Sequence, residues 1–194
     1  MELQVALFQA DIPVSDADGE LIERAKHDRQ AFALLYRRHY ARIAGYIHRR
    51  IGDPHVTEDL VADTFMTALR CLPKYRHRGA PLTAWLYRIA TTSVNRWVRR
   101  QRRWFRSLDG GVAAAQAVAR VSDRADGEAD RESVRKALLA LAPRHQSVIS
   151  LHYLEGLSAE EVSQALGCRL GTVKSRLSRG REALREKLLC GGRS

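Results

Sequence analysis

The sequence predicts an all-α protein in which two small helical domains are joined by a flexible linker. Leu, Ala and Arg dominate, and only five of the 194 residues are proline, a composition that favours helix. Apolar residues recur at three- and four-residue spacing in two blocks, 19–106 and 131–190. Residues 107–130, between the blocks, are rich in Ala, Gly and Asp and resemble a linker. Residues 1–18 are expected to form a loose leader, and residues 191–194 a tail.

Positive charge is concentrated in one part of the chain. The net charge is +11, and residues 70–106 contain eleven Lys or Arg and no Asp or Glu. Such an excess suits a polyanionic partner, with nucleic acid as the first candidate and an anionic membrane surface as the second.

Several classes of protein are excluded by features that the sequence lacks. No stretch approaches 18 consecutive apolar residues, so no membrane span is predicted. Residues 1–11 lack the basic start and apolar middle of a secretory signal. Cys71, Cys168 and Cys190 are an odd number at no metal-like spacing, and the seven histidines form no ligand pair. We therefore expect free thiols in a reducing compartment, a cytoplasmic protein, and neither a metal nor a cofactor.

Three helices are predicted in the first block. The first covers residues 32–51, where apolar residues keep helical spacing, and it ends at the Gly-Asp-Pro sequence that follows. The second begins near Thr57, and Pro73 closes it. After an arginine-rich loop, Pro81 suits the first turn of a long third helix that runs to about Arg103.

The second block contains the sharpest local motif, a helix-turn-helix over residues 158–184. Ser158 and Glu161 have the spacing of a capping box, and Gly167 is the expected left-handed cap of the first short helix. A second helix follows after a short turn, with an apolar side that begins at Val173. Two short helices joined by a glycine-containing turn can place the second helix in the DNA major groove.

Helical phasing assigns different roles to the two sides of that second helix. Val173, Leu177, Gly180, Leu184 and Leu188 share the core side. Lys174, Ser175, Ser178, Arg179 and Glu182 lie on the exposed side or its flank, where basic and hydroxyl groups can reach base edges. Arg176 and Arg181 lie nearer the core side, where phosphate contacts or intramolecular pairing suit them. The alternative is a solvated face on an ordinary helical hairpin.

The long helix of residues 81–103 carries a second candidate surface. Its predicted core face consists of Leu82, Trp85, Leu86, Ile89, Ser93 and Trp97. A basic and polar stripe consists of Arg88, Thr91, Thr92, Asn95, Arg99 and Arg102. Beside the arginine-rich loop, such a stripe could hold single-stranded DNA, because phosphates need cations and unstacked bases need planar or polar pockets. The alternative is a highly charged, solvated helix.

Three motifs give the chain a resemblance to a known family. They read TEDLVADTF at 57–65, LTAWLYRIA at 82–90, and EGLSAEEVSQALG followed by GTVKSRLSRGREALREKL within 155–188. With these motifs in this order, the chain resembles the small bacterial sigma factors of the extracytoplasmic-function type, which keep only two of the sigma helical domains. The resemblance implies that residues 19–106 are sigma region 2 and residues 131–190 are sigma region 4.

The resemblance also implies partners for the first domain. Its second helix would bind the clamp helices of the RNA polymerase β′ subunit through Asp59, Leu60, Asp63 and Phe65. Its loop and long helix would capture the melted −10 promoter element. The residues implied in −10 binding are Tyr75, Arg76, His77, Arg78, Arg88, Thr92, Asn95, Arg96 and Arg99.

The second domain would read the −35 element as a duplex and would sit on the polymerase β flap. The residues implied in −35 binding are Arg169, Thr172, Lys174, Ser175, Arg176, Ser178 and Arg179. The linker would thread toward the polymerase active site, and its acidic residues would suit a channel that holds RNA: Asp109, Asp123, Asp126, Glu128 and Asp130. Family members are often held inactive by an anti-sigma protein, and no residue here identifies one.

The chain departs from the family pattern at three positions. Ala62 stands where the family usually has a Gln before the acid of the second helix. The contribution of this helix to polymerase binding is therefore expected to differ from that in the family. Thr92 replaces a frequent Asn at the expected pocket for a flipped −10 base. Arg169 replaces a common Pro at the start of the base-reading helix, where it is a poor N-cap but a candidate phosphate contact.

Two other functions compete with this interpretation. A repressor or activator with the same helix-turn-helix predicts an acidic receiver or a ligand pocket in the first 100 residues, but that part is basic and shows no βα pattern. A nucleic-acid enzyme such as a recombinase needs an organised nucleophile or carboxylate cluster. The carboxylates here lie in helix starts and in the linker, so the sequence predicts no catalytic site.

Overall fold

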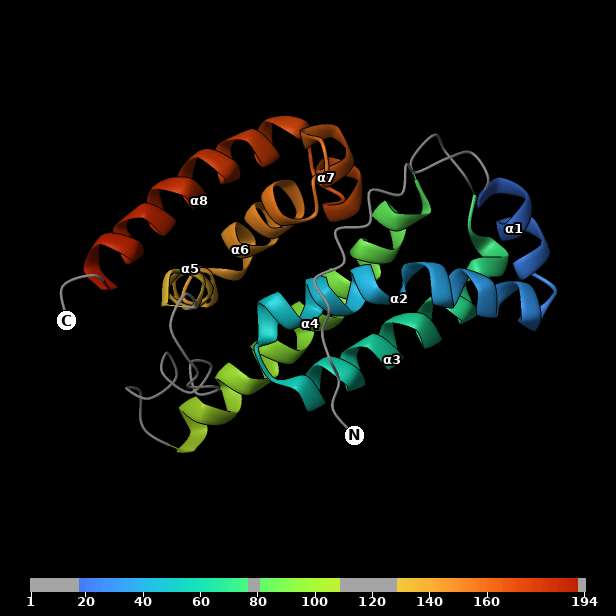
Figure 1. The fold of residues 1–194 in the computed structure, drawn as a ribbon, viewed down its shortest axis with the longest axis horizontal. Coiled ribbons are helices and arrows are strands. Elements are labelled where there is room, and N and C mark those ends of the chain that lie inside the picture. Colours follow the sequence, from blue (N-terminus) through green and yellow to red (C-terminus); the bar gives the residue numbers. More distant parts are fainter. Residues whose placement is uncertain (1–17, 77–80, 109–128, 192–194) are drawn as a thin grey trace.

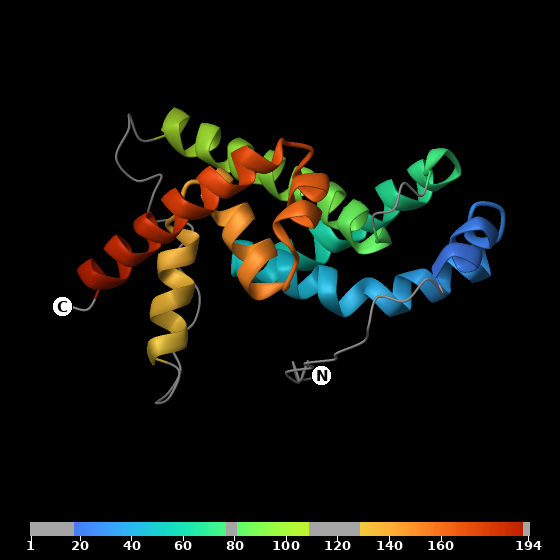
Figure 2. The same ribbon diagram turned by 90° about the horizontal axis from the view of Figure 1, so that it is seen from above.

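In the computed structural model, residues 18–76, 81–108 and 129–191 are described, and every regular element within these ranges is helical (Figures 1 and 2). The first domain consists of α1 (Asp18–Ala25), α2 (Arg29–Ile51), α3 (Pro54–Cys71), the short 3-10 helix η1 (Leu72–Lys74) and α4 (Leu82–Leu108). The second consists of α5 (Ala129–Leu139), α6 (Pro143–Ile149), the π-helical turn η4 (Ser150–Leu154), α7 (Ala159–Leu166) and α8 (Leu170–Gly191). The all-α fold class with two helical domains is confirmed.

The boundaries of the predicted linker shift by two residues at each end. Helix α4 continues to Leu108 and α5 begins at Ala129, whereas the sequence predicted a linker over residues 107–130. The leader up to residue 17, the linker core 109–128 and the last three residues lie outside the described ranges. No described helix has both the length and the apolar character needed to cross a bilayer.

Helix α3 starts earlier than the sequence predicted. Asp53 is its N-cap, and the Asp53 carboxylate accepts a hydrogen bond from Val56 N at 2.9 Å. Pro54 occupies the first turn, where its missing N–H has no helical partner to lose. The prediction of a start near Thr57 was therefore wrong, because the Asp-Pro pair was interpreted only as the end of the preceding helix.

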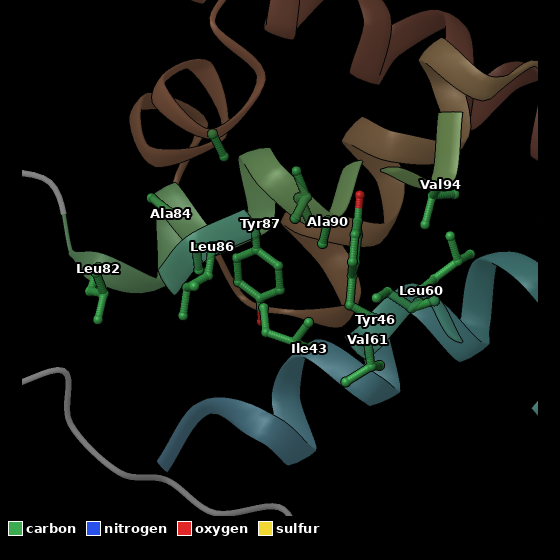
Figure 3. Close-up of a cluster of buried hydrophobic side chains, with 14 of the residues drawn as sticks. Ile43, Tyr46, Leu60, Val61, Leu82, Ala84, Leu86, Tyr87, Ala90 and Val94 are labelled. Carbon is green, nitrogen blue, oxygen red and sulfur yellow. The ribbon is translucent and has the colours of Figure 1, made fainter. Parts of the chain in front are cut away.

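The core of the first domain lies among α2, α3 and α4 (Figure 3). Ile43 and Tyr46 of α2 meet Val61 of α3 and Val94 of α4, and all four are nearly inaccessible to solvent. The rings of Tyr46 and Tyr87 pack edge to face with centroids 5.2 Å apart. Because burying one large apolar side chain contributes about 1.5–3 kcal/mol, this cluster fixes α4 against the other two helices.

The helix-turn-helix forms as predicted. Ser158 Oγ accepts from Glu161 N at 3.1 Å, and Glu161 Oε2 accepts from Ser158 N at 2.8 Å, which completes the capping box. Gly167 ends α7 in the left-handed conformation with φ 61°, which residues with a Cβ adopt at a cost. These local features set the two ends of α7.

Replacing Ser158 with Ala is expected to destabilise the second domain by about 1 kcal/mol, because Glu161 N loses its capping acceptor. The midpoint of urea unfolding, followed by circular dichroism, measures the change. Ser163→Ala in the same helix is the control, since its hydroxyl only returns a bond to the Glu160 carbonyl. Equal midpoints for the two variants would contradict the role of the cap.

The two domains pack against each other along a seam that the sequence did not predict. Helix α7 lies on α4, and the last turn of α2 meets α5, α6 and η4 (Figures 1 and 2). The buried apolar side chains of both domains belong to one continuous cluster. We call this contact region the interdomain seam.

Candidate nucleic-acid and polymerase interfaces

Helix α8 has an exposed polar face that is separate from its packing face. Val173, Leu177 and Gly180 are buried. The side chains predicted for the opposite side are exposed: Lys174, Ser175, Ser178, Arg179 and Glu182. The phasing prediction is confirmed for these positions, so basic and hydroxyl groups are available to a DNA groove.

The exposure of the side chains on the flanks of α8 agrees only in part with the prediction. Arg176 is half-buried, as expected for a residue near the core side, but Arg181 is fully exposed. Arg169 precedes the helix and is exposed, and its carbonyl accepts from Thr172 N at 2.9 Å and from Val173 N at 3.1 Å. A guanidinium has donors only, so the Arg169 side chain cannot cap the N–H groups in the first turn of α8.

A concentration of cations surrounds one edge of α8. Partial burial is the main cause that lowers the pKa of His145, and the nearby Arg144, Arg179 and Arg176 lower it further. His145 Nε2 accepts from Arg144 Nε at 3.4 Å. Three guanidinium groups around one imidazole create a local positive field, which suits a phosphate group next to the exposed face of α8.

The stripe predicted on α4 is divided between surface and interior. Arg88, Thr92, Arg96 and Arg99 are exposed. Thr91 is buried and shares a 2.6 Å hydrogen bond with Tyr46 Oη. The surface that could meet DNA is therefore narrower than helical phasing indicated, because α2 and α7 cover two sides of α4.

Asn95 belongs to the inner part of that stripe. Its side-chain oxygen accepts from Arg50 Nη2 at 2.8 Å, and the residue is only half-exposed. A base contact by Asn95 would have to compete with this bond.

The described part of the arginine-rich loop is anchored by an aromatic pair. Tyr75 is only 9% exposed, and its ring lies 4.7 Å from that of Trp85. Tyr75 therefore holds the loop to α4 and does not present a free stacking surface. Arg76 is exposed, whereas His77 and Arg78 lie outside the described residues.

The face of α3 predicted to bind polymerase has an exposed and a buried half. Leu60 and Phe65 are buried, and the Phe65 ring packs 4.7 Å from Tyr36. Asp59 and Asp63 are exposed. Leu60 and Phe65 therefore hold the helix in place, and only the two acids are available to a partner.

Helices α2 and α3 also carry exposed apolar residues. Met66 on α3 is 54% exposed, and Leu34, Tyr36 and Tyr40 on α2 are also exposed. With Ala62, the residues Asp59, Asp63 and Met66 follow the spacing of one helix face. The sequence analysis gave Met66 no role, and it counted Tyr36 and Tyr40 among the apolar residues at helical spacing.

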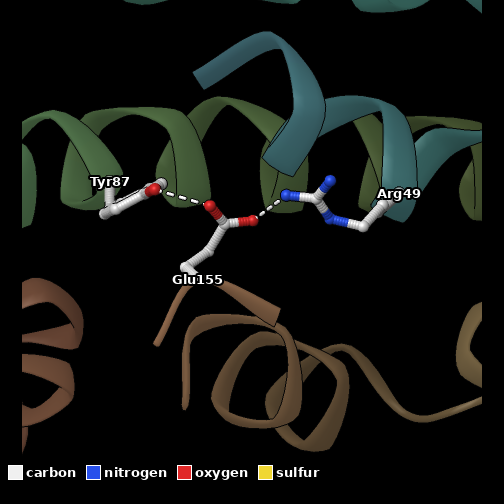
Figure 4. A network of polar contacts seen from close by, with 3 residues as sticks. All are labelled: Arg49, Tyr87 and Glu155. Atoms are coloured by element: carbon white, nitrogen blue, oxygen red, sulfur yellow. Dashed lines mark hydrogen bonds and ion pairs between the residues drawn. The ribbon is translucent and has the colours of Figure 1, made fainter. Parts of the chain in front are cut away.

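A polar network crosses the interdomain seam (Figure 4). Glu155 forms an ion pair with Arg49, and its second carboxylate oxygen accepts from Tyr87 Oη at 2.7 Å. Burial raises the pKa of Tyr87 well above its ordinary value, and the charge of Glu155 raises it further, so Tyr87 remains a donor. Sequence analysis gave none of these three residues a role.

A buried arginine lies beside this network. Arg50 is 1% exposed and donates to Tyr46 Oη at 2.9 Å, to Asn95 Oδ1 and, across the seam, to Gln146 Oε1 at 3.4 Å. The burial of Arg50 could have been predicted from the sequence, because Arg50 follows Ile47 and Tyr46 at the three- and four-residue spacing of one helix face.

The described residues contain no group of three or more His, Cys, Asp or Glu side chains that could hold a metal ion.

Comparison with known proteins identifies both domains. Residues 35–104 match the Sigma-70 region 2 family, and residues 131–184 match the Sigma-70, region 4 family. The chain is 35% identical to the RNA polymerase sigma-H factor of Pseudomonas aeruginosa, over 89% of this chain and 94% of that protein. It is 33% identical to the ECF RNA polymerase sigma-E factor of Salmonella typhimurium, over 88% and 94%.

Solved structures agree with this comparison. The sigma factor RpoE of Bartonella quintana, solved with the anti-sigma factor NepR, superimposes with a TM-score of 0.66 at 27% identity, over 81% of this chain and 96% of that chain. CnrH, solved with the cytosolic domain of CnrY, gives a TM-score of 0.66 at 26% identity, over 92% and 100%. The chain belongs to the sigma-70 family of RNA polymerase sigma factors, in the extracytoplasmic-function group.

Proposed function

We propose that this non-enzymatic transcription-initiation factor divides promoter recognition between its two domains. The exposed side of α8 reads the −35 duplex. The exposed arginine side of α4, with the loop before it, captures the melted −10 strand, and the acidic and apolar face of α3 binds the β′ clamp helices of core polymerase. The observation that carries this proposal is the segregation of α8, whose packing residues and base-reading residues lie on opposite sides.

The two DNA surfaces suit different forms of DNA. A rigid helix with short polar and basic side chains can enter a groove and read base edges. Residues 70–106, which include most of α4, contain no Asp or Glu, and such a segment suits the backbone of a single strand. The partly exposed Trp85 and Trp97 on the same helix add aromatic surface near this path.

Further partners are proposed for the second domain and for the whole factor on the basis of family membership. We propose that the second domain also sits on the β flap, and that the linker threads toward the polymerase active site. One similar structure contains an anti-sigma factor, so an anti-sigma partner is part of the proposal, as is action in the cytoplasm with the polymerase.

Run-off transcription with core polymerase and a genomic promoter library tests the proposed function. Promoter-specific transcripts that require this protein are the expected result. The repressor or activator alternative instead predicts nanomolar, sequence-specific duplex binding by the free protein at physiological salt, and no specific transcripts from core polymerase.

Replacing Arg179 with Ala is expected to change the base preference at the −35 element. Loss of a bidentate guanine contact costs about 1–3 kcal/mol. Open-complex formation on a template that is already melted at −10 should not change, because Arg179→Ala leaves the α4 surface as it is. Permanganate footprinting measures opening, and Arg185→Ala, also exposed on α8, is the control. An Arg179 variant that fails on pre-melted DNA would show that the two roles are not separate.

A further inference from the structure

Helices α6 and α8 lie side by side in the second domain (Figure 1), and they approach each other closely at one turn. Gly180 of α8 is buried there. A Cβ built on Gly180 would lie 3.1 Å from an Ile149 side-chain atom and 3.4 Å from His145 Cβ. Because position 180 has no side chain, His145 of α6 lies directly against α8.

Cations from both helices gather around His145. Arg176 and Arg179 lie on the turn of α8 before Gly180. Arg144 precedes His145 in α6, and it is exposed, as is Arg179. These three guanidinium groups are the charged groups that act on the imidazole, and all of them are positive. The cluster therefore reaches solvent along the edge of α8, beside the face proposed to read the −35 duplex.

The imidazole of His145 is uncharged in this arrangement. A guanidinium has donors only, so the Nε2 atom that accepts from Arg144 Nε at 3.4 Å carries no proton. Partial burial lowers the pKa of His145, and the three guanidinium groups lower it further. The free protein thus holds one neutral imidazole among three cations.

A phosphate of the DNA backbone at this edge would reverse the preference for the neutral form. Its negative charge offsets the repulsion from the guanidinium groups, and a nearby opposite charge favours the charged form of a titratable group. Once protonated, His145 Nε2 is a donor and no longer accepts from Arg144. Protonation therefore gives the phosphate two new donors, the imidazolium of His145 and the released guanidinium of Arg144.

We propose that His145 is a proton-linked phosphate contact, which takes up a proton when the DNA backbone binds at the edge shared by α6 and α8. The proposal extends the duplex contact from α8 to α6, and it rests on the proposed function of the second domain. Because a phosphate carries no sequence information, this contact positions the domain and adds affinity for any duplex sequence.

The direction of the pH dependence follows from the proton uptake. The pKa of His145 lies below its ordinary value in the free chain, and the bound phosphate raises it in the complex. Above both pKa values neither form is protonated, and the affinity does not change with pH. As the pH falls between the two values, the complex binds the proton first. The affinity for DNA then rises, by at most about tenfold per pH unit for one proton.

Fluorescence anisotropy measures this dependence with a labelled duplex that carries a −35 sequence from a promoter found by transcription. The full-length chain is used at constant, low ionic strength, because salt weakens phosphate contacts. Between about pH 7.5 and about pH 6, the affinity of the wild type is expected to rise roughly fivefold. His145→Gln should lose most of this gain. His145→Lys, which is charged throughout, should bind at the higher pH about as tightly as the wild type at the lower pH.

The control variant removes a histidine at another site. His55→Gln, at an exposed position of α3, should keep the full gain in affinity. A wild-type gain in His145→Gln would overturn the proposal. His145→Lys that binds no more tightly than the wild type at the higher pH, with a normal circular dichroism spectrum, would also overturn it, because a cation at this position would then not reach the phosphate.

Nuclear magnetic resonance follows the ionisation of His145 itself. The ring Cε1–H signal of His145 is assigned by its absence in His145→Gln. We expect the midpoint of its titration to move to higher pH when the duplex is added, and to move little with inorganic phosphate at millimolar concentration. No movement with the duplex would overturn the proton uptake. An equal movement with inorganic phosphate would show a general anion site and overturn the assignment to DNA.

A duplex of scrambled sequence separates this proposal from the proposed function. A phosphate contact predicts the same gain in affinity with the scrambled duplex, and the same loss of that gain in His145→Gln. If the wild type showed no preference for the −35 sequence, base reading by α8 would be wrong. The pH dependence with either duplex would still decide whether His145 contacts a phosphate.

Discussion

Core RNA polymerase is expected to lose this sigma factor when Asp59 is changed to Lys and Asp63 to Asn. Both acids are exposed on α3 beside Met66, and charge reversal at the centre of an interface commonly costs 2 kcal/mol or more, so at least a roughly 30-fold loss of affinity is expected. Asparagine at position 63 keeps an acceptor for Ser93 Oγ, which bonds Asp63 at 2.7 Å. The fold of α3 against α4 should therefore survive.

Co-purification with core polymerase and run-off transcription measure the effect. Glu20→Lys, on the exposed surface of α1, repeats the charge reversal of Asp59→Lys away from the proposed interface and should bind normally. Normal binding by the Asp59/Asp63 variant, with an unchanged circular dichroism spectrum, would remove this face of α3 from the polymerase interface and leave the family assignment intact.

The second large effect is expected from Arg50. Replacing it with Met should destabilise the protein by about 2–4 kcal/mol, because Asn95 and Gln146 lose a hydrogen-bonding partner in a buried site. The guanidinium carbon also lies 5.5 Å from the centre of the Tyr46 ring, so a cation–π contact is lost as well.

Urea unfolding followed by circular dichroism gives the size of this effect. Arg37→Met, at an exposed position of the same helix, should stay within about 0.5 kcal/mol of the wild type. A midpoint for Arg50→Met equal to that of Arg37→Met would show that the buried guanidinium contributes little, and that its neighbours find other partners.

The sequence could predict the features that are local. Ser158, Glu161 and Gly167 act within one turn of their own helix, so their spacing alone determined the capping box and the cap. The exposed side of α8 was equally predictable, because Val173 and Leu177 set the direction of the core. The start of α3 was predicted wrongly, since Asp53 and Pro54 can end one helix and begin the next.

The features that depend on tertiary packing could not be predicted in the same way. Asn95 continues the polar stripe of α4 in sequence, but its side chain accepts a hydrogen bond from the buried Arg50 of α2. Tyr75 belongs to a basic loop, and only its contact with Trp85 shows that it is an anchor. In the sequence, Glu155 and Arg49 resemble ordinary surface charges, because these two residues pair with each other across 106 positions of the chain.

Gly180 illustrates how the second domain can change its promoter preference. A Cβ built at this position would lie 3.1 Å from an Ile149 side-chain atom and 3.4 Å from His145 Cβ, so α6 lies close against this side of α8 and would have to shift slightly to admit a side chain. The packing of α8 is thus confined to one side, and substitutions at Lys174, Ser175, Ser178 or Arg179 alter no buried contact. Such a helix can acquire a new target sequence in single steps that leave the stability of the domain almost unchanged, which lets duplicated copies of the factor diverge toward separate sets of promoters.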